Sequence, residues 1–297
     1  MLARHTAKAF DADLQELVRS IGEMGRLAER QIIEAIESLS TRDGGRARRL
    51  VAADDVIDAM QRVIEEKAVA TIARRQPVAN DLWQLIGALR IANELERVGD
   101  LAKNIGKRIM TFSGAEPPRP RAPAPARRQP SRQPENPPRD VVTGPDRSGP
   151  SPLHEVGRMA TLLLDQFRDV LDSFANRDLA KAIEVWTRDQ EVDRLCTTLF
   201  RELLAHMMDK PADVTFGIHL LFCTKNFERI GDHATNIAEA VHYMVAGQML
   251  ACERPKADAT SALRVTTLAC EGFAPNVRRS VRIDPAFPKT NQYRVVE

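Results

Sequence analysis

The stretch "ERVGDLAKNIGKRI" at positions 96–109 returns in similar form as "ERIGDHATNIAEAV" at positions 228–241. Both carry an acidic residue, a glycine, a second acidic residue and an asparagine in the same order, 132 positions apart. The two acidic residues of each stretch are four positions apart, so in a helix they lie on one face, one turn from each other. The recurrence indicates an internal duplication.

The similarity extends well beyond this motif. A shift of 135 positions superposes Gly22 on Gly157, Met24 on Met159, Glu34 on Asp169, Glu37 on Asp172, and the pair Arg42 and Asp43 on Arg177 and Asp178. The shift falls from 135 to 132 further along, a loop difference that a chain absorbs easily. We therefore predict two homologous halves, over 1–112 and 153–257.

Each half has the pattern of three helices. Apolar residues of the first half recur every three or four positions, which predicts one long amphipathic helix: Phe10, Leu14, Leu17, Ile21, Met24, Ala28, Ile32, Ile36 and Leu39. Asp43 is the expected cap of a second helix, which "RRQP" at 74–77 ends, and a third helix runs over about 79–111. Asp178 and "DKPAD" at 209–213 repeat this layout. The predicted fold is all-α, with two tandem three-helix bundles.

Two segments differ from the rest in composition. Residues 113–152 contain 12 of the 18 prolines and almost no large apolar side chain, which predicts an extended, disordered linker. Residues 258–297 show no helical period and are expected to form an irregular tail. These two segments hold the excess basic charge and leave the remainder at −3, so a nucleic-acid groove is not indicated.

Several classes of protein are disfavoured. The four cysteines (Cys196, Cys223, Cys252 and Cys270) have no CxxC spacing, which argues against a disulfide framework or a zinc knuckle. The first residues lack the apolar core of a signal peptide, and no run of about 18 apolar residues could span a bilayer. We expect a soluble, cytoplasmic protein.

Acidic pairs recur on the predicted second helices as well. Asp54 and Asp58 are four apart in "DDVID", and Asp189 and Asp193 are four apart in "DQEVD", again related by the shift of 135. If the second and third helices of each half are antiparallel neighbours, four carboxylates converge in each half. The predicted sets are Asp54, Asp58, Glu96 and Asp100, and Asp189, Asp193, Glu228 and Asp232.

Sites made of carboxylates alone suit hard or borderline cations, so magnesium, manganese or iron is the expected occupant. Asn104 and Asn236 lie one turn further along the same faces and could add an amide oxygen or a supporting hydrogen bond. Gly99 and Gly231 recur in mid-helix, where glycine costs about 1 kcal/mol relative to alanine. Their recurrence indicates either close helix approach or ligand access.

Two alternatives stand beside the metal sites. Acidic residues on helices usually form a solvated face, and Arg97, Lys103, Lys107 and Arg229 could neutralise some of these charges. A di-metal oxidase on a helical bundle needs Glu-x-x-His on two helices. Glu239 and His242 have that spacing, but Lys107 and Met110 stand at the equivalent positions, and no nucleotide-binding or hydrolase motif is present.

The chain resembles the PhoU family of phosphate-specific transport system accessory proteins. The resemblance rests on "HTAKAFDADLQELVRSIGEMGRLAE" (5–29), "DLWQLIGALRIANELERVGDLAKNIGKR" (81–108), "HLLFCTKNFERIGDHATNIAEAV" (219–241) and "RPKADATS" (254–261). It covers about three quarters of the chain, and the repeated E-R-[VI]-G-D motif is highly specific. The long Pro/Arg-rich insert and the last 40 residues depart from the family pattern.

The resemblance implies a cytoplasmic regulator of phosphate uptake that restrains the phosphate-starvation response. Its implied partners are a phosphate-sensing histidine kinase, the ATPase subunit of the phosphate ABC importer and a second copy of the chain. It also implies metal ions, among them iron, manganese, magnesium or zinc, on the eight acidic residues named above. Three hypotheses remain open: a metal-bound regulator, a carboxylate-bridged di-metal enzyme and a metal-free adaptor.

Overall fold

The computed structural model describes residues 2–114 and 151–250. They form α1 (Leu2–Thr41), α2 (Gly44–Arg75), α3 (Asn80–Ser113), α4 (Pro152–Asn176), α5 (Leu179–Asp209), a short 3₁₀ turn η1 (Pro211–Asp213) and α6 (Val214–Ala246). No strand occurs within these ranges, so the predicted all-α class is confirmed. The predicted linker over 113–152 and tail over 258–297 fall almost entirely outside the described residues.

The turns that begin α2 and α5 are built alike. Arg42 and Arg177 adopt left-handed backbone angles, with φ of 53° and 54°. The aspartate that follows each of them caps the helix: Asp43 Oδ1 accepts the N–H of Gly45 at 2.8 Å, and Asp178 Oδ1 accepts the N–H of Lys181 at 3.1 Å. Each cap satisfies an amide that has no partner inside the helix. Both predicted caps are confirmed.

The apolar stripe predicted on α1 forms part of the hydrophobic core. All of its residues are buried except Ile36, which is partly buried and packs against the core. Ion pairs beside the stripe also repeat. Arg46 Nε lies 2.6 Å from Glu34 Oε2, and Lys181 Nζ lies 3.2 Å from Asp169 Oδ1 at the positions that the shift of 135 superposes. The duplication is therefore visible in structure as well as in sequence.

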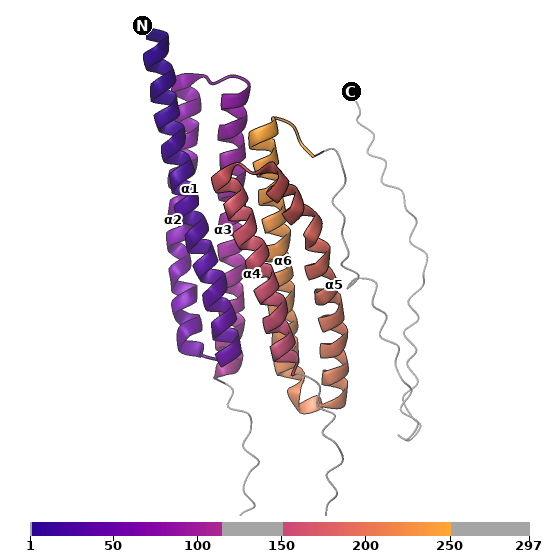
Figure 1. The fold of residues 1–297 in the computed structure, drawn as a ribbon. Helices are drawn as coiled ribbons and strands as arrows, with labels where there is room; N and C mark the ends of the chain where they lie inside the picture. Colours follow the sequence, from indigo (N-terminus) through magenta and orange to yellow (C-terminus); the bar gives the residue numbers. More distant parts are fainter. Residues whose placement is uncertain (1, 115–150, 251–297) are drawn as a thin grey trace, which may run out of the picture. The chain divides into compact units, whose positions relative to one another are not determined.

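The helices α3 and α6 lie side by side and pack against each other more extensively than any other pair (Figure 1). Glycines permit close contact between the halves. A Cβ added to Gly87 of α3 would lie 1.9 Å from Met244 Cγ of α6, and one added to Gly25 of α1 would lie 2.7 Å from Leu171 Cδ2 of α4. The six helices consequently belong to one compact unit.

We call the α3–α6 contact the seam.

Within residues 2–114 and 151–250, no helix has both the length and the apolar character that crossing a bilayer requires.

Candidate functional site

The first predicted set of carboxylates lies between α2 and α3. Asp54 of α2 is fully buried, whereas Asp58, Glu96 and Asp100 are partly buried. Lys103, one turn beyond Asp100 on α3, places its Nζ 2.6 Å from Asp54 Oδ2 and 3.2 Å from Asp100 Oδ1. The two helices are thus joined by an ammonium group that contacts a carboxylate of each.

The four carboxylates of this half influence one another electrostatically. Burial raises the pKa of Asp54 above its ordinary value, although the hydrogen bond and charge of Lys103 act in the opposite direction. Burial also raises the pKa of Glu96, and the nearby charges of Asp100, Asp58 and Asp54 add to this rise. We call Asp54, Asp58, Glu96 and Asp100 the first acid cluster.

A glutamine of α1 completes the surroundings of this cluster. A Cβ added to Gly99 would lie 2.9 Å from Asp54 Oδ1 and 3.1 Å from Gln31 Oε1, so the glycine leaves room for both oxygens. Within the described residues, Gln31 Oε1, Asp54 Oδ1 and Asp58 Oδ1 are buried and accept no hydrogen bond. Buried acceptors without a partner are costly, and a bound cation is one way to satisfy them.

The second set lies on α5 and α6. Asp189, Asp193 and Glu228 are buried and Asp232 is partly buried; we call these four residues the second acid cluster. Gln166 of α4 donates its Nε2–H to Asp189 Oδ1 at 3.1 Å.

The second acid cluster also has a lysine and a glycine. Lys225 Nζ lies 3.0 Å from Glu228 Oε2. A Cβ added to Gly231 would lie 3.2 Å from Asp189 Oδ1, so this glycine has the same place beside a buried aspartate as Gly99.

The sequence prediction did not include the two glutamines. Gln31 and Gln166 are superposed by the same shift of 135, and each lies beside the buried aspartate at the start of its cluster. A comparison of the two halves at every polar position would have found them. The shared position indicates that each cluster draws a side chain from all three helices of its half.

The two predicted asparagines lie in different surroundings. Asn104 is exposed on α3. Asn236 of α6 donates its Nδ2–H to Glu94 Oε2 at 2.9 Å, and His233 Nδ1 lies 2.6 Å from the same oxygen. Burial alone would raise the pKa of Glu94, but the hydrogen bonds from His233 and Asn236 lower it overall. Asn236 therefore has its partner across the seam.

The Glu-x-x-His pair of α6 is engaged in structural contacts. Trp186 Nε1–H of α5 donates to Glu239 Oε1 at 2.9 Å. His242 Nδ1 lies 3.0 Å from the backbone oxygen of Gln248, just beyond the end of the helix. These contacts account for both side chains as parts of the helix packing.

The clusters have the donor types that a hard cation prefers. Their carboxylate and amide oxygens are hard ligands, and three oxygens near the first acid cluster have no hydrogen bond from any described residue. Over residues 2–114 and 151–250, however, no three His, Cys, Asp or Glu side chains are arranged so as to hold a metal ion. In the first acid cluster it is Lys103 that supplies the positive charge. Metal binding stays a prediction, and it requires these side chains to rearrange.

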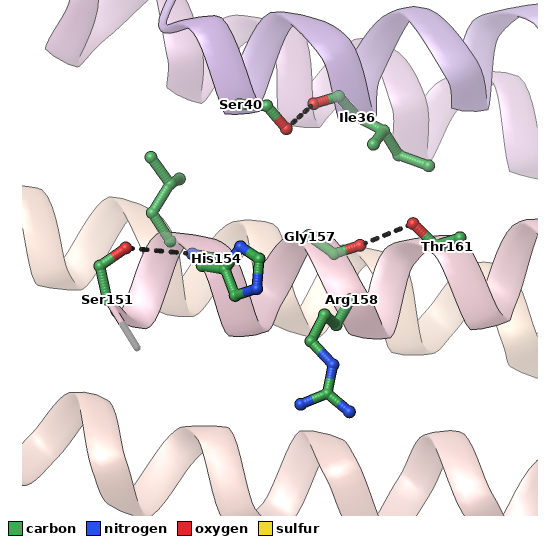
Figure 2. A pocket seen from close by; sticks show the side chains of 8 residues that line it. Ile36, Ser40, Ser151, His154, Gly157, Arg158 and Thr161 are labelled. Carbon is green, nitrogen blue, oxygen red and sulfur yellow. Dashed lines mark hydrogen bonds between the residues drawn. The ribbon is translucent and has the colours of Figure 1, made fainter. Parts of the chain in front are cut away.

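A separate cavity of about 420 Å³ lies between the end of α1 and the start of α4 (Figure 2). The hydroxyls of Ser40 and Thr161 donate to backbone carbonyls one turn earlier in their own helices. Arg158 extends to the side of α4 away from Ser40 and lies 3.0 Å from Glu155. The polar groups around this cavity are therefore largely engaged within the protein.

Comparison with known proteins matches both halves. A family model described as "PhoU domain" matches residues 21–109 and 156–241. The phosphate-specific transport system accessory protein PhoU homolog of Rhizobium meliloti (strain 1021) is 41% identical over 263 residues, which cover 89% of this chain and 98% of that protein. The homolog of Caulobacter vibrioides (strain NA1000 / CB15N) is 40% identical over 260 residues, with 88% and 100% covered.

The fold matches as well. The crystal structure of PhoU from Pseudomonas aeruginosa superposes with a TM-score of 0.67 at 31% identity, covering 80% of this chain and 100% of that one. Because the family model recurs once in each half of the duplication, and the matched relatives are covered almost from end to end, the chain belongs to the PhoU family.

Proposed function

We propose that the chain is a cytoplasmic, non-catalytic regulator that restrains phosphate uptake and phosphate-starvation signalling. The observation that carries this proposal is its similarity, through both repeats, to proteins named phosphate-specific transport system accessory proteins, at 41% identity over 98% of one of them. An accessory protein of a transport system acts through binding. The proposed activity therefore consists of contacts made by the helical surfaces.

The proposed partners are a phosphate-sensing histidine kinase, the ATPase subunit of the phosphate ABC importer and a second copy of the chain. The protein would reach the membrane only through these partners, and it would bind no nucleic acid. Two exposed apolar residues one turn apart on α6, Ile218 and Phe222, support binding through helix faces.

Each acid cluster would hold a divalent or trivalent metal ion, with iron, manganese, magnesium and zinc as the candidates. The bound cation would balance the carboxylates that α2 and α3, or α5 and α6, present to each other, and so would stabilise the packing of these helices. The ligands would come from the two clusters as defined above, with Asn104 as an additional oxygen donor at the exposed side. In this proposal the metal has a structural role.

The regulatory function can be tested by deletion and complementation. Loss of the gene should raise expression of a phosphate-starvation reporter in phosphate-rich medium, and the wild-type gene should restore low expression. Tagged full-length protein should retain the kinase and the importer ATPase in a pull-down, whereas an unrelated ATPase should not be retained. A deletion strain with an unchanged reporter and unchanged phosphate uptake would contradict the proposal.

The metal can be tested separately on purified protein. Elemental analysis should find bound metal in the wild type and a marked loss in the variant that combines Glu96→Ala, Asp100→Ala, Glu228→Ala and Asp232→Ala. Unchanged metal content in this variant would falsify the ligand assignment. Metal-dependent oxygen consumption by the wild type would instead support the di-metal enzyme, and normal stability and regulation by the variant would support a metal-free adaptor.

A further inference from the structure

The first half has a groove between α1 and α2 that the proposed function does not use. Its volume is about 370 Å³, which lies within the range of small-ligand pockets. The lining residues are Leu27, Arg30, Gln31, Ile33, Glu34, Arg46, Arg49, Leu50 and Ala53. Leu27, Ile33 and Leu50 provide an apolar floor, because Leu50 is buried and the other two are partly buried against the core.

The arginines at the rim of this groove differ in whether they form ion pairs with other described residues. Arg46 is paired with Glu34, at 2.6 Å, and with Glu37. Arg30 and Arg49 are exposed, and neither is in an ion pair with another described residue. Glu34 is the only acidic residue among those that line the groove, and Arg46 engages it. The groove therefore combines an apolar floor with two exposed guanidinium groups, of which that of Arg49 acts through its charge on Glu34 and Asp43 without an ion pair to either.

The second half has a different residue at one position of this groove, that of Ala53. The shift of 135 superposes Ala53 on Arg188. Arg188 reaches from α5 to α4, with its Nη2 at 2.5 Å from Asp169 Oδ2, and its Nη1 lies 3.3 Å from Glu184 Oε1. Alanine cannot make this bridge, so at this position the first half lacks the second crossing between the helices, and only Arg46 among the groove residues pairs across them.

The charges at the rim are reversed between the halves. Arg30 superposes on Asp165, and Arg49 superposes on Glu184. In the second half Glu184 is paired with Arg188 and Asp165 with Arg168, whereas in the first half Arg30 and Arg49 form no ion pair with another described residue. The group that complements the first half is an anion.

We propose that the groove between α1 and α2 binds a small amphipathic anion, a carboxylate or phosphoryl group on a short apolar body. The anionic group lies between Arg30 and Arg49, and the apolar body covers Leu27, Ile33 and Leu50. Arginine suits this role because its planar guanidinium forms paired hydrogen bonds with either kind of head group. This site shares Gln31 with the surroundings of the first acid cluster but contains none of its carboxylates, and it does not depend on metal binding or on the proposed partners.

Titration calorimetry of the full-length protein provides the test, with hexanoate and hexyl phosphate as probes. A Kd on the order of 1 mM is expected for ligands of about this size. Ala53→Arg, which introduces the residue that the second half has, should weaken binding by roughly tenfold or more, as should Arg49→Glu. Arg48→Glu is the matched control, because Arg48 is exposed on the same helix and does not line the groove. It should leave the affinity nearly unchanged.

Binding of either probe with this pattern of variants supports the site, and the tighter probe identifies the head group. Equal binding of 1-hexanol would overturn the role of the two arginines. Equal binding of inorganic phosphate and hexyl phosphate would overturn the role of the apolar floor. The same loss in Arg48→Glu as in Arg49→Glu, or full affinity in Ala53→Arg, would show that the groove is not the site. Circular dichroism melting of each variant verifies that the fold is retained.

Discussion

The two acid clusters occupy equivalent positions in the repeats, but lysines from different positions balance them. Lys103 contacts the first cluster, and the residue at its repeat position in the second half is Thr235, which is buried. Lys225 pairs with Glu228 in the second cluster, and the residue at its repeat position is Asn93. The carboxylates therefore occupy equivalent positions in the two halves, whereas the lysine comes from a different position in each. The packed carboxylates thus require a positive charge nearby, and a lysine at more than one position can provide this charge.

The glutamines extend this comparison. Within the described residues, Oε1 of both Gln31 and Gln166 is buried without a hydrogen bond, but Gln166 donates its Nε2–H to Asp189, whereas no such bond joins Gln31 to Asp54. Asp54 correspondingly keeps one buried oxygen without a donor. The first cluster therefore depends more heavily on its lysine, because among the described residues it is Lys103 that makes a charge-assisted contact to Asp54.

The largest effect is expected for Lys103→Met, which keeps the length of the side chain and removes its charge. Asp54 is fully buried, so loss of the ammonium leaves its carboxylate without compensation. The free energy of unfolding at pH 7 should fall by about 2 kcal/mol, below the full cost of breaking a buried pair because Lys103 is partly exposed. Urea denaturation followed by circular dichroism measures this change.

Added manganese or magnesium should restore more stability to Lys103→Met than it adds to the wild type, because the metal then replaces the missing charge. Lys107→Met is the matched control, since Lys107 is exposed on the same helix, and it should change stability little. Equal losses in the two variants would contradict the role assigned to Lys103.

A second pair of variants tests the glutamines. Gln166→Met removes the donor to Asp189 and should lower the free energy of unfolding by about 1.5 kcal/mol, because a buried charged acceptor loses a hydrogen bond. Gln31→Met removes a side chain without such a bond, so the expected loss is below about 0.5 kcal/mol. Both values come from chemical denaturation at pH 7. A larger loss for Gln31→Met would reverse the comparison between the halves.

Alanine substitution of the two glycines should also cost different amounts of stability, and both losses should be smaller than that of Gln166→Met. In Gly99→Ala the new methyl group would lie 2.9 Å from Asp54 Oδ1, and in Gly231→Ala it would lie 3.2 Å from Asp189 Oδ1. Crowding of a packed site costs roughly 1–3 kcal/mol, and better helix propensity offsets about 1 kcal/mol of this. We expect a net loss of about 1 kcal/mol for Gly99→Ala and a smaller one for Gly231→Ala, measured as above. Stabilisation by Gly99→Ala would show that the cluster adjusts freely.

Much of the fold was predictable because it follows from local rules and from the duplication. Residue types and spacing directly predict the helix caps at Asp43 and Asp178 and the apolar stripe of α1. The approach of Glu96 and Asp54 also follows, since four-residue spacing on neighbouring antiparallel helices limits where the side chains lie.

The seam could not be predicted in the same way. Spacing along α6 groups Asn236 with Asp232, but it does not tell which neighbouring helix each side chain faces. Asn236 faces α3 because the two halves pack through α3 and α6, and that contact arises from complementary surfaces of residues more than a hundred positions apart. The contact of Lys103 with Asp54 likewise depends on the distance between two helices, which spacing within one helix leaves open.

Of the two variants that remove a charge, the one with the smaller expected effect lies at this seam, where the halves again differ. Glu94 accepts from His233 and Asn236, whereas the residue at its repeat position is Asn226, which cannot carry the charge. Glu94→Gln keeps the shape of the side chain and removes its charge, so at pH 7 it should lower the free energy of unfolding by about 1 kcal/mol.

The pH dependence of this loss follows from the pKa of Glu94, which its partners hold below the ordinary value of 4.5. A carboxyl group with a lowered pKa in the folded state contributes stability above the ordinary pKa, and that contribution disappears as the pH falls through the lowered value. The advantage of the wild type over Glu94→Gln should therefore shrink as the pH falls from about 5.5 to below about 4.5. Urea denaturation of both proteins across this range measures it. A difference that stays the same at every pH would mean that the seam needs the shape of Glu94 and not its charge.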